Sequence, residues 1–153
     1  MSTKRCIASM DINITGGVTG DLGLDKMITE LKKLDGKTIE AGLFDEENEK
    51  KAIWNEYGTS RGIPARPFLR NTLYENEARY ANFIAPFVVQ VIEGGTAENI
   101  SERLGKFMVM SIQRTIAAGG FTPNAPATIR KKGHSKTLID TGEMYGAIDW
   151  RES

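Results

Sequence analysis

Two long amphipathic segments joined by Gly94-Gly95 constrain the fold of this 153-residue chain more than any other feature. In residues 68–92 and again in 100–116, apolar side chains recur at the spacing that places them on one face of a helix. The short glycine turn between them predicts an antiparallel helical hairpin. Pro86 interrupts the first segment and is expected to bend or break that helix. Thr96 is expected to cap the second helix.

Shorter elements are predicted on both sides of this hairpin. Residues 24–34 form an amphipathic pattern whose apolar face, beginning with Leu24, is expected to belong to the core. Residues 37–44 alternate between polar and apolar side chains, as in a half-buried strand. A short helix ending at Gly58 is predicted after the DEENEKK run, and residues 145–150 alternate as a last strand.

These elements together predict one α+β domain over residues 1–153. The expected architecture is a small, mainly antiparallel sheet, packed with the amphipathic N-terminal helix and the long helical hairpin. Residues 1–23 are interpreted as a flexible or extended N-terminal arm, with a strand or extended stretch over 5–14, a turn at Gly16-Gly17 and a glycine-rich loop after it.

Composition narrows the functional classes. Lys+Arg and Asp+Glu are equal at 20 each, so no overall field attracts nucleic acid or an anionic membrane. No stretch approaches the length of a membrane span, and the first residues lack the apolar core of a signal peptide, so we expect a protein made in a cytoplasm that does not enter a membrane. Cys6 is the only cysteine and is interpreted as a small buried hydrophobe.

Catalytic and ligand-binding patterns are not evident in the sequence. His134 is the sole histidine, and no second histidine, cysteine pair or metal-binding motif accompanies it, which favours a solvated loop over a general base. The glycine clusters do not form a nucleotide-binding fingerprint. We therefore expect neither enzymatic activity nor a cofactor or metal.

A basic cluster surrounds this histidine. Its members are Arg130, Lys131, Lys132 and Lys136. Exposed cations on a loop can neutralise DNA phosphates, but no aromatic residues or groove-reading helix accompany these. Two interpretations stay open, a solvated loop and a non-specific contact with passing DNA or with an acidic partner surface.

The segment from Trp54 to Leu73 predicts a rigid bend between two helices, because glycine and proline punctuate it. Trp54 and Tyr57 are expected to lie in the core. The proline after Arg66 imposes an extended backbone on it, so that Arg66 could pair with a carboxylate across an interface or with an intrachain partner such as Glu56. The sequence leaves these two alternatives open.

Two blocks of this sequence resemble a family of bacteriophage proteins. The first is EYGT followed by IPARPFLR, residues 56–70, and the second is APATIRKKG followed by LIDTGEMYGAIDW, residues 125–150. In this wording and order the chain is similar to the tail-completion, or head–tail joining, proteins of tailed bacteriophages, a group called phage virion morphogenesis proteins. The resemblance covers residues 24–150 in the order of elements.

This resemblance implies a structural subunit of a homo-oligomeric ring, sixfold or twelvefold, in the neck of the virion. Such a ring joins the DNA-filled head to the tail, contacts connector or portal-side proteins and tail tube or terminator proteins, and lets DNA pass through its lumen. It would be assembled in the host bacterial cytoplasm and would have no catalytic residues. The alternatives are a tail terminator capping the tail tube and, from other classes, a phage-encoded hydrolase or a DNA-binding module.

Ring formation requires interfaces whose rotation closes, and stiff loops reduce the entropy lost on assembly. The bend, the loop over residues 120–140 and the N-terminal arm are therefore the expected contact surfaces. The expected interface residues are Tyr57, Arg61, Ile63, Arg66, Phe68 and Arg70, and the expected DNA or lumen contacts are Arg130, Lys131, Lys132 and Lys136.

Overall fold

The computed structural model describes residues 6–13 and 24–153. The predicted turn at Gly16-Gly17 and the glycine-rich loop after it lie outside the described residues. The described chain is a small α+β domain with the element order β1-α1-β2-α2-α3-α4-α5-α6-β3. This confirms the fold class predicted from the sequence.

Three antiparallel strands form the sheet, in the order β1-β2-β3. They are β1 (Ile7–Asp11), β2 (Thr38–Gly42) and β3 (Asp149–Glu152). Ala8 lies opposite Ala41, which lies opposite Trp150, so the C-terminal strand completes a sheet begun at the N-terminus. The predicted strand over 5–14 is therefore part of the domain. The last strand begins at Asp149, and Tyr145 belongs to the helical turn before it, contrary to the prediction of a strand from that residue.

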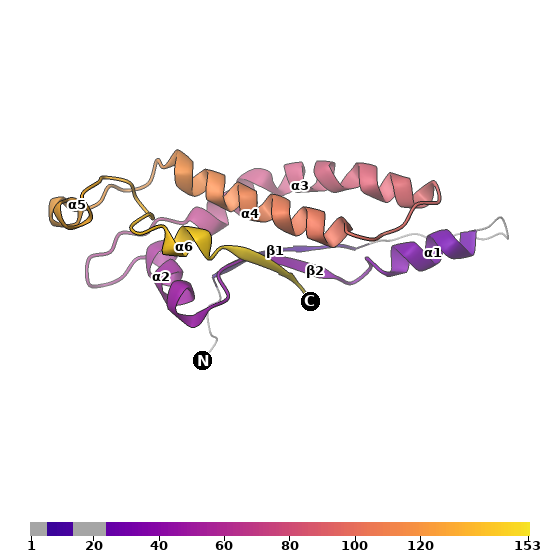
Figure 1. The fold of residues 1–153 in the computed structure, drawn as a ribbon, viewed down its shortest axis with the longest axis horizontal. Coiled ribbons are helices and arrows are strands. Elements are labelled where there is room, and N and C mark those ends of the chain that lie inside the picture. The colour runs from indigo at the N-terminus through magenta and orange to yellow at the C-terminus, as the bar shows by residue number, and fades with distance from the viewer. Residues whose placement is uncertain (1–5, 14–23) are drawn as a thin grey trace.

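The predicted hairpin consists of α3 (Phe68–Ile92) and α4 (Ile100–Ala118), which lie side by side along one face of the sheet (Figure 1). α4 packs against β2 and β3, whereas α3 packs against α4 and β1. Aromatic rings hold the two helices together, and the stacked rings of Phe83 and Phe107 have centroids 4.6 Å apart. Large apolar residues on facing stripes thus explain why this pair of helices forms.

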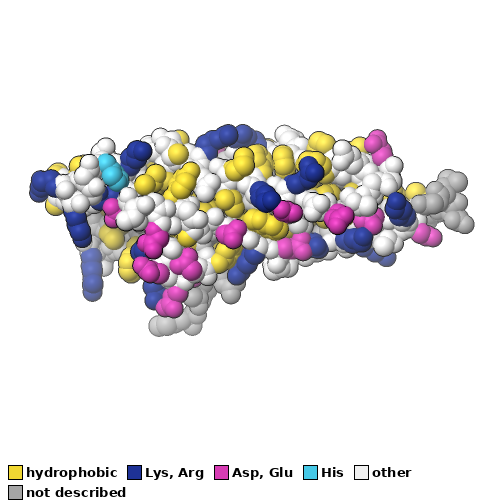
Figure 2. Space-filling view, in the orientation of Figure 1, with side chains coloured by type: hydrophobic (Ala, Val, Ile, Leu, Met, Phe, Trp, Pro, Cys, Tyr) yellow, Lys and Arg dark blue, Asp and Glu magenta, His cyan; other side chains and the backbone are white. Residues whose placement is uncertain are grey.

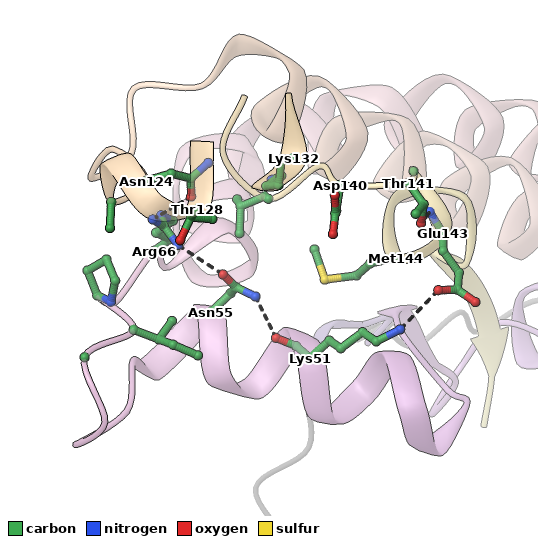
Figure 3. Close-up of a pocket in the computed structure, with 16 residues that line it drawn as sticks. Lys51, Asn55, Arg66, Asn124, Thr128, Lys132, Asp140, Thr141, Glu143 and Met144 are labelled. Carbon is green, nitrogen blue, oxygen red and sulfur yellow. Dashed lines mark hydrogen bonds and ion pairs between the residues drawn. The ribbon is translucent and has the colours of Figure 1, made fainter. Parts of the chain in front are cut away.

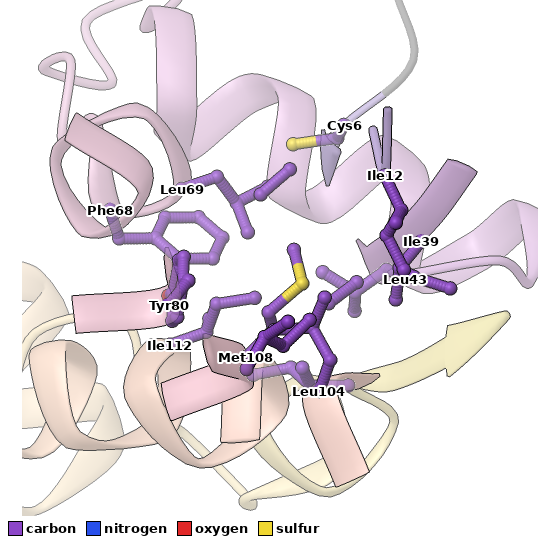
Figure 4. Packing of buried hydrophobic residues seen from close by; sticks show 14 of the residues in the cluster. Cys6, Ile12, Ile39, Leu43, Phe68, Leu69, Tyr80, Leu104, Met108 and Ile112 are labelled. Atoms are coloured by element: carbon purple, nitrogen blue, oxygen red, sulfur yellow. The ribbon is translucent and has the colours of Figure 1, made fainter. Parts of the chain in front are cut away.

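The core lies between the hairpin and the sheet (Figure 4). Alternate residues of each strand and one stripe of each helix enter it, as their periods of two and 3.6 require. The most deeply buried side chains, each at most 2 % exposed, include Leu34, Ile39, Leu43, Phe68, Tyr80, Leu104, Met108 and Ile112. Most of the predicted inner stripe of α4 is buried here.

Four shorter helices surround this core. α1 (Leu24–Lys32) lies near the loop between α3 and α4. α2 (Glu46–Tyr57) lies at the opposite end of the strands from that loop (Figure 1). α5 (Pro126–Lys132) projects at one end of the molecule, and α6 (Glu143–Gly146) packs on α2. Asp45 caps α2 by accepting a hydrogen bond from the N–H of Asn48 at 2.9 Å.

The hairpin differs from the predicted one in two details: Pro86 does not break the first helix, and Thr96 does not cap the second. α3 continues through Pro86, which is exposed, as is Asn82, whose carbonyl loses the hydrogen bond that proline cannot donate. Water can satisfy that carbonyl, so the helix does not end there. Thr96 does not cap α4, because the helix begins at Ile100 after Asn99 in a left-handed conformation with φ 65°.

Three predictions about burial also need correction. Along α1, Leu24 is only half-buried and the buried residue is Glu30, whose carboxylate accepts the N–H of Ala97 at 2.9 Å. The end of the predicted stripe does reach the core, because Leu34 is 2 % exposed and Leu31 packs against the core. Trp54 and Tyr57 are 48 % and 41 % exposed and do not belong to the core. Ile92, at the end of the predicted inner face of α3, is exposed too.

Candidate interaction surface

A tight bend leads from α2 into α3. α2 ends at Gly58, whose φ of 71° favours glycine, and a Cβ there would lie 2.8 Å from the carbonyl oxygen of Ile63. The N–H of Thr59 donates to that same carbonyl at 2.9 Å and closes the loop. Exposed Arg61 lies at the tip of this loop. The bend is predicted from glycine and proline. In the structure its backbone folds back on itself, and the hydrogen bond from Thr59 to Ile63 restrains it.

Glu56 holds the start of α3. Pro67 precedes the helix and has no side chain that can cap it. The carboxylate of Glu56, 1 % exposed, takes this role by accepting the N–H of Leu69 at 3.0 Å and that of Arg70 at 3.1 Å. The Arg70 guanidinium also donates to it through Nε at 2.9 Å. Helix N-termini favour negative charge. Since Glu56 belongs to α2, its carboxylate at the start of α3 links the two helices.

The sequence leaves two kinds of partner open for Arg66, a carboxylate across an interface and a group of the same chain. The structure shows the second. Arg66 is 5 % exposed, and its partners are intrachain: Nε donates to the carbonyl of Thr122 at 2.7 Å. Nη2 donates to the carbonyl of Pro123 and to the side chain of Asn124. Nη1 donates to Asn55 at 3.3 Å. All of these acceptors are neutral, and burial lowers the pKa of the guanidinium.

The expected interface residues therefore divide into two groups. Arg66 and Phe68 are buried and cannot contact a partner, which contradicts their prediction as interface residues. Tyr57, Arg61 and Ile63 are exposed. The Arg70 side chain is 57 % exposed, but its guanidinium lies over the Tyr57 ring and pairs with Glu56, so it is partly committed to its own chain.

Residues 124–137, here called the basic finger, contain α5 and the expected DNA contacts. None of the residues of α5 is buried. Its base is closed by the side chain of Asn124, which donates to the carbonyls of Ser135 and Lys136 at 3.4 and 3.0 Å. The ammonium of Lys132 also donates to the carbonyl of Lys136 at 3.1 Å. The finger is thus an exposed element with an internally bonded base.

Positive charge concentrates on this finger. Figure 2 shows Lys and Arg side chains at the end of the molecule where α5 lies, and acidic side chains nearer α2. Arg130, Lys131 and Lys136 are exposed, whereas Lys132 is half-buried. The pKa of Lys132 is lowered, mainly by burial and in a lesser degree by Arg66, while Asp140 opposes the shift.

A cavity of about 450 Å³ lies between the bend, the finger and α6 (Figure 3). Arg66 and Asn124 lie on one side of it, and an ion pair between Lys51 and Glu143, at 3.1 Å, lies on the other. Its walls include residues 62–66 of the first sequence block and residues 125–144 of the second, together with Lys51, Asn55 and Asn124. Segments about sixty residues apart thus meet in one place.

Cys6 and His134 are the remaining candidate groups that the sequence singled out. Burial, assisted by Glu56 and Glu49, raises the pKa of the Cys6 thiol to about 12, and the predicted burial of this residue is confirmed. His134 is in the finger, with Nε2 3.4 Å from the carbonyl oxygen of Asp140.

Within residues 6–13 and 24–153, no group of three or more His, Cys, Asp or Glu side chains could hold a metal ion. In the same described residues, no helix is long and apolar enough to cross a membrane.

The sequence does not predict the roles of two anchoring residues, Glu56 and Asn124. It offers Glu56 only as a possible partner for Arg66 and gives no signal for Asn124. The available signal for Glu56 is the helix that starts after Pro67 without a capping side chain, which requires an acceptor from elsewhere.

In comparisons with known proteins, no family model, no curated protein and no solved structure matches this chain.

Proposed function

We propose that this protein is a structural subunit of the neck of a tailed bacteriophage, in a homo-oligomeric ring that joins the head to the tail. One observation carries the proposal. The two sequence blocks that resemble tail-completion proteins, far apart in the chain, line one cavity, and Arg66 of the first block bonds to residues 122–124, which lead directly into the second. Blocks that share one structural unit support a resemblance to a family as a whole, whereas unrelated short matches have no reason to meet.

The surface beside this unit has the residue types of a protein interface. Trp54 and Tyr57 lie one turn apart on α2, and Ile63 lies in the loop that follows, 37 % exposed. Tryptophan, tyrosine and arginine are enriched among residues that dominate binding energy. A rigid bend that presents them reduces the ordering cost of association. This surface is the proposed contact between neighbouring subunits.

The position in the neck follows from the resemblance alone. A tail terminator at the end of the tail tube is the second candidate, since it would use the same kind of ring. Both belong to the virion, and both would contact adjacent proteins on the two faces of the ring.

Quantitative mass spectrometry of purified tailed particles from the source tests the proposal. This chain is counted against the portal and major tail proteins, and a ring subunit gives a fixed small number of copies per particle. Electron microscopy of the neck then separates a joining ring from a terminator. Absence of the chain from intact infectious particles overturns the proposal.

A variant experiment tests the contact surface. Trp54→Ser with Tyr57→Ser changes exposed side chains that the domain core does not need, so we expect a folded protein that no longer enters particles. Val89→Ser is the control, because Val89 is 49 % exposed and lies near the opposite end of α3 from the bend. Normal incorporation of the double variant contradicts this placement of the interface.

A further inference from the structure

The basic finger gathers Arg130, Lys131, Lys132 and Lys136 in a stretch of chain that contains no acidic residue. Among the described residues, Arg130, Lys131 and Lys136 are exposed and form no ion pair. No Asp or Glu occurs between Glu102 and Asp140 in the sequence. The cations that do form ion pairs are Lys33, Lys37, Lys50, Lys51, Arg70, Lys106 and Arg151. In a chain whose charges balance, this leaves a local excess of positive charge at one end.

The finger is also held in place. Arg66 donates to the carbonyls of Thr122 and Pro123 and to the side chain of Asn124, and Asn124 in turn closes the base of the finger. Arg66 itself is buried. The exposed cations therefore project from a base whose geometry is set before any ligand arrives, which reduces the entropy lost on binding.

We propose that the basic finger is a contact site for the phosphate backbone of double-stranded DNA, with Arg66 as the positioning residue that holds it. Arg130, Lys131 and Lys136 would each contact a phosphate. No carboxylate of the protein has to be displaced from these cations before the phosphate binds. This deepens the proposed function and rests on it for its biological setting, in which the finger faces the lumen of the ring.

The chemistry of the finger favours a nucleic acid over a protein partner. Protein interfaces bury aromatic or large apolar anchors and are depleted in lysine. The large exposed hydrophobic residues of the described chain lie on α2, on the bend, on α3 and on α4, and none lies in the finger.

The residue types also indicate backbone contact without base recognition. No Phe, Tyr or Trp occurs between Phe121 and Tyr145, so the finger lacks the large aromatic platforms on which unpaired bases stack. α5 has seven residues and does not form a recognition helix that reaches base edges along a groove. We therefore expect binding that is independent of sequence and strongly dependent on salt.

An NMR titration of the full chain with a random-sequence DNA duplex tests this inference, because it detects weak binding and locates it. Amide signals of residues 124–137 should shift first. If three phosphates are contacted, raising salt from about 25 to about 100 mM should weaken binding roughly 40-fold, since the slope is about −0.9 per phosphate. The variant Arg130→Gln/Lys131→Gln/Lys136→Gln should lose this salt-dependent binding.

The matched control is Lys32→Gln/Lys50→Gln/Lys106→Gln, which removes the same net charge from exposed positions on other helices. It should bind DNA as the unchanged protein does. Equal loss in both variants, or signals that shift outside the finger, overturns the inference. So does the absence of any shift at low salt.

Two further readouts separate this inference from the proposed function. If the finger variant binds DNA normally but no longer assembles with other copies in native mass spectrometry, the finger is a protein contact and the inference is wrong. If the chain is absent from virions but the finger still binds duplex DNA, the proposed function fails while the DNA-contact site stands.

Discussion

The indole ring of Trp150 lies directly against the backbone of Gly105, so close that a Cβ at position 105 would be 2.2 Å from the ring atom Cδ2. Gly105 is in the middle of α4, where glycine lowers helix stability, and Trp150 is in β3. The absence of a side chain at one position lets the C-terminal strand approach the hairpin.

Gly105→Ala should therefore destabilise the protein although alanine favours helix. The gain in helix propensity is about 1 kcal/mol, but forcing a methyl group against Trp150 requires the strand or the ring to move. We expect a net loss of about 1–3 kcal/mol in the free energy of unfolding, measured by urea denaturation. Gly146→Ala is the control, because no atom lies within 4 Å of the added methyl group. Equal stability of the two variants contradicts the close packing.

Glu56→Gln should destabilise the joint between α2 and α3. The substitution keeps the shape but removes the charge that accepts two helix N–H groups and faces Arg70. Hydrogen bonds to charged groups are the stronger ones, so we expect a loss of about 2 kcal/mol in the free energy of unfolding. Glu46→Gln, in an exposed pair on the same helix, should leave the urea midpoint unchanged. Equal midpoints for the two variants would show that Glu56 does not cap α3.

Arg66→Lys should loosen the basic finger while keeping the charge. Lysine lacks the planar guanidinium that donates to four carbonyl or amide acceptors, so some of these acceptors lose their partner. We expect a loss of roughly 2 kcal/mol in stability and faster amide hydrogen exchange in residues 124–137. Arg61→Lys, at an exposed position of the bend, is the matched control. Unchanged exchange in the finger contradicts the role of Arg66 as its anchor.

Stability should fall in alkali because of Cys6. Burial raises the pKa of its thiol from 9.0 to about 12, so the folded state holds the thiol proton more tightly than the unfolded state. This contribution is fully present below pH 9 and is lost as the pH rises toward about 12. Relative to Cys6→Ala, the free energy of unfolding should decrease by up to about 1.4 kcal/mol per pH unit within that window. Parallel pH profiles for the two proteins would show that the thiol does not ionise on unfolding.

The elements of this fold were readable from local patterns. The hairpin follows from two apolar stripes of helical period, and Gly58, where the sequence predicts the end of a short helix, has a positive φ in the structure. The pair Glu47 and Lys51, four residues apart on α2, lies at 2.7 Å as its spacing predicts. Such features depend on neighbours within one or two turns, which the sequence contains in full.

Burial at the candidate surface was not readable in the same way. Trp54 and Tyr57 are residue types usually found in cores, but they are exposed. Glu30, Glu56 and Arg66 are residue types usually found at the surface, but they are buried. Each buried charge is held by backbone groups distant in the chain, such as the N–H of Ala97 or the carbonyl of Thr122. A sequence does not show which backbone groups lack a partner until the chain is folded.

By itself, the sequence determined the α+β class, the hairpin, the excess of positive charge near residue 131 and the rigid bend, because periodicity, net charge and glycine or proline geometry are local properties. Only the tertiary structure decided that Arg66 faces inward, that Glu56 caps a helix to which it does not belong, and that the two blocks share one cavity. The physical reason is that buried polar groups must find partners, and in this chain the available partners come from segments brought together by the packing of the hairpin on the sheet.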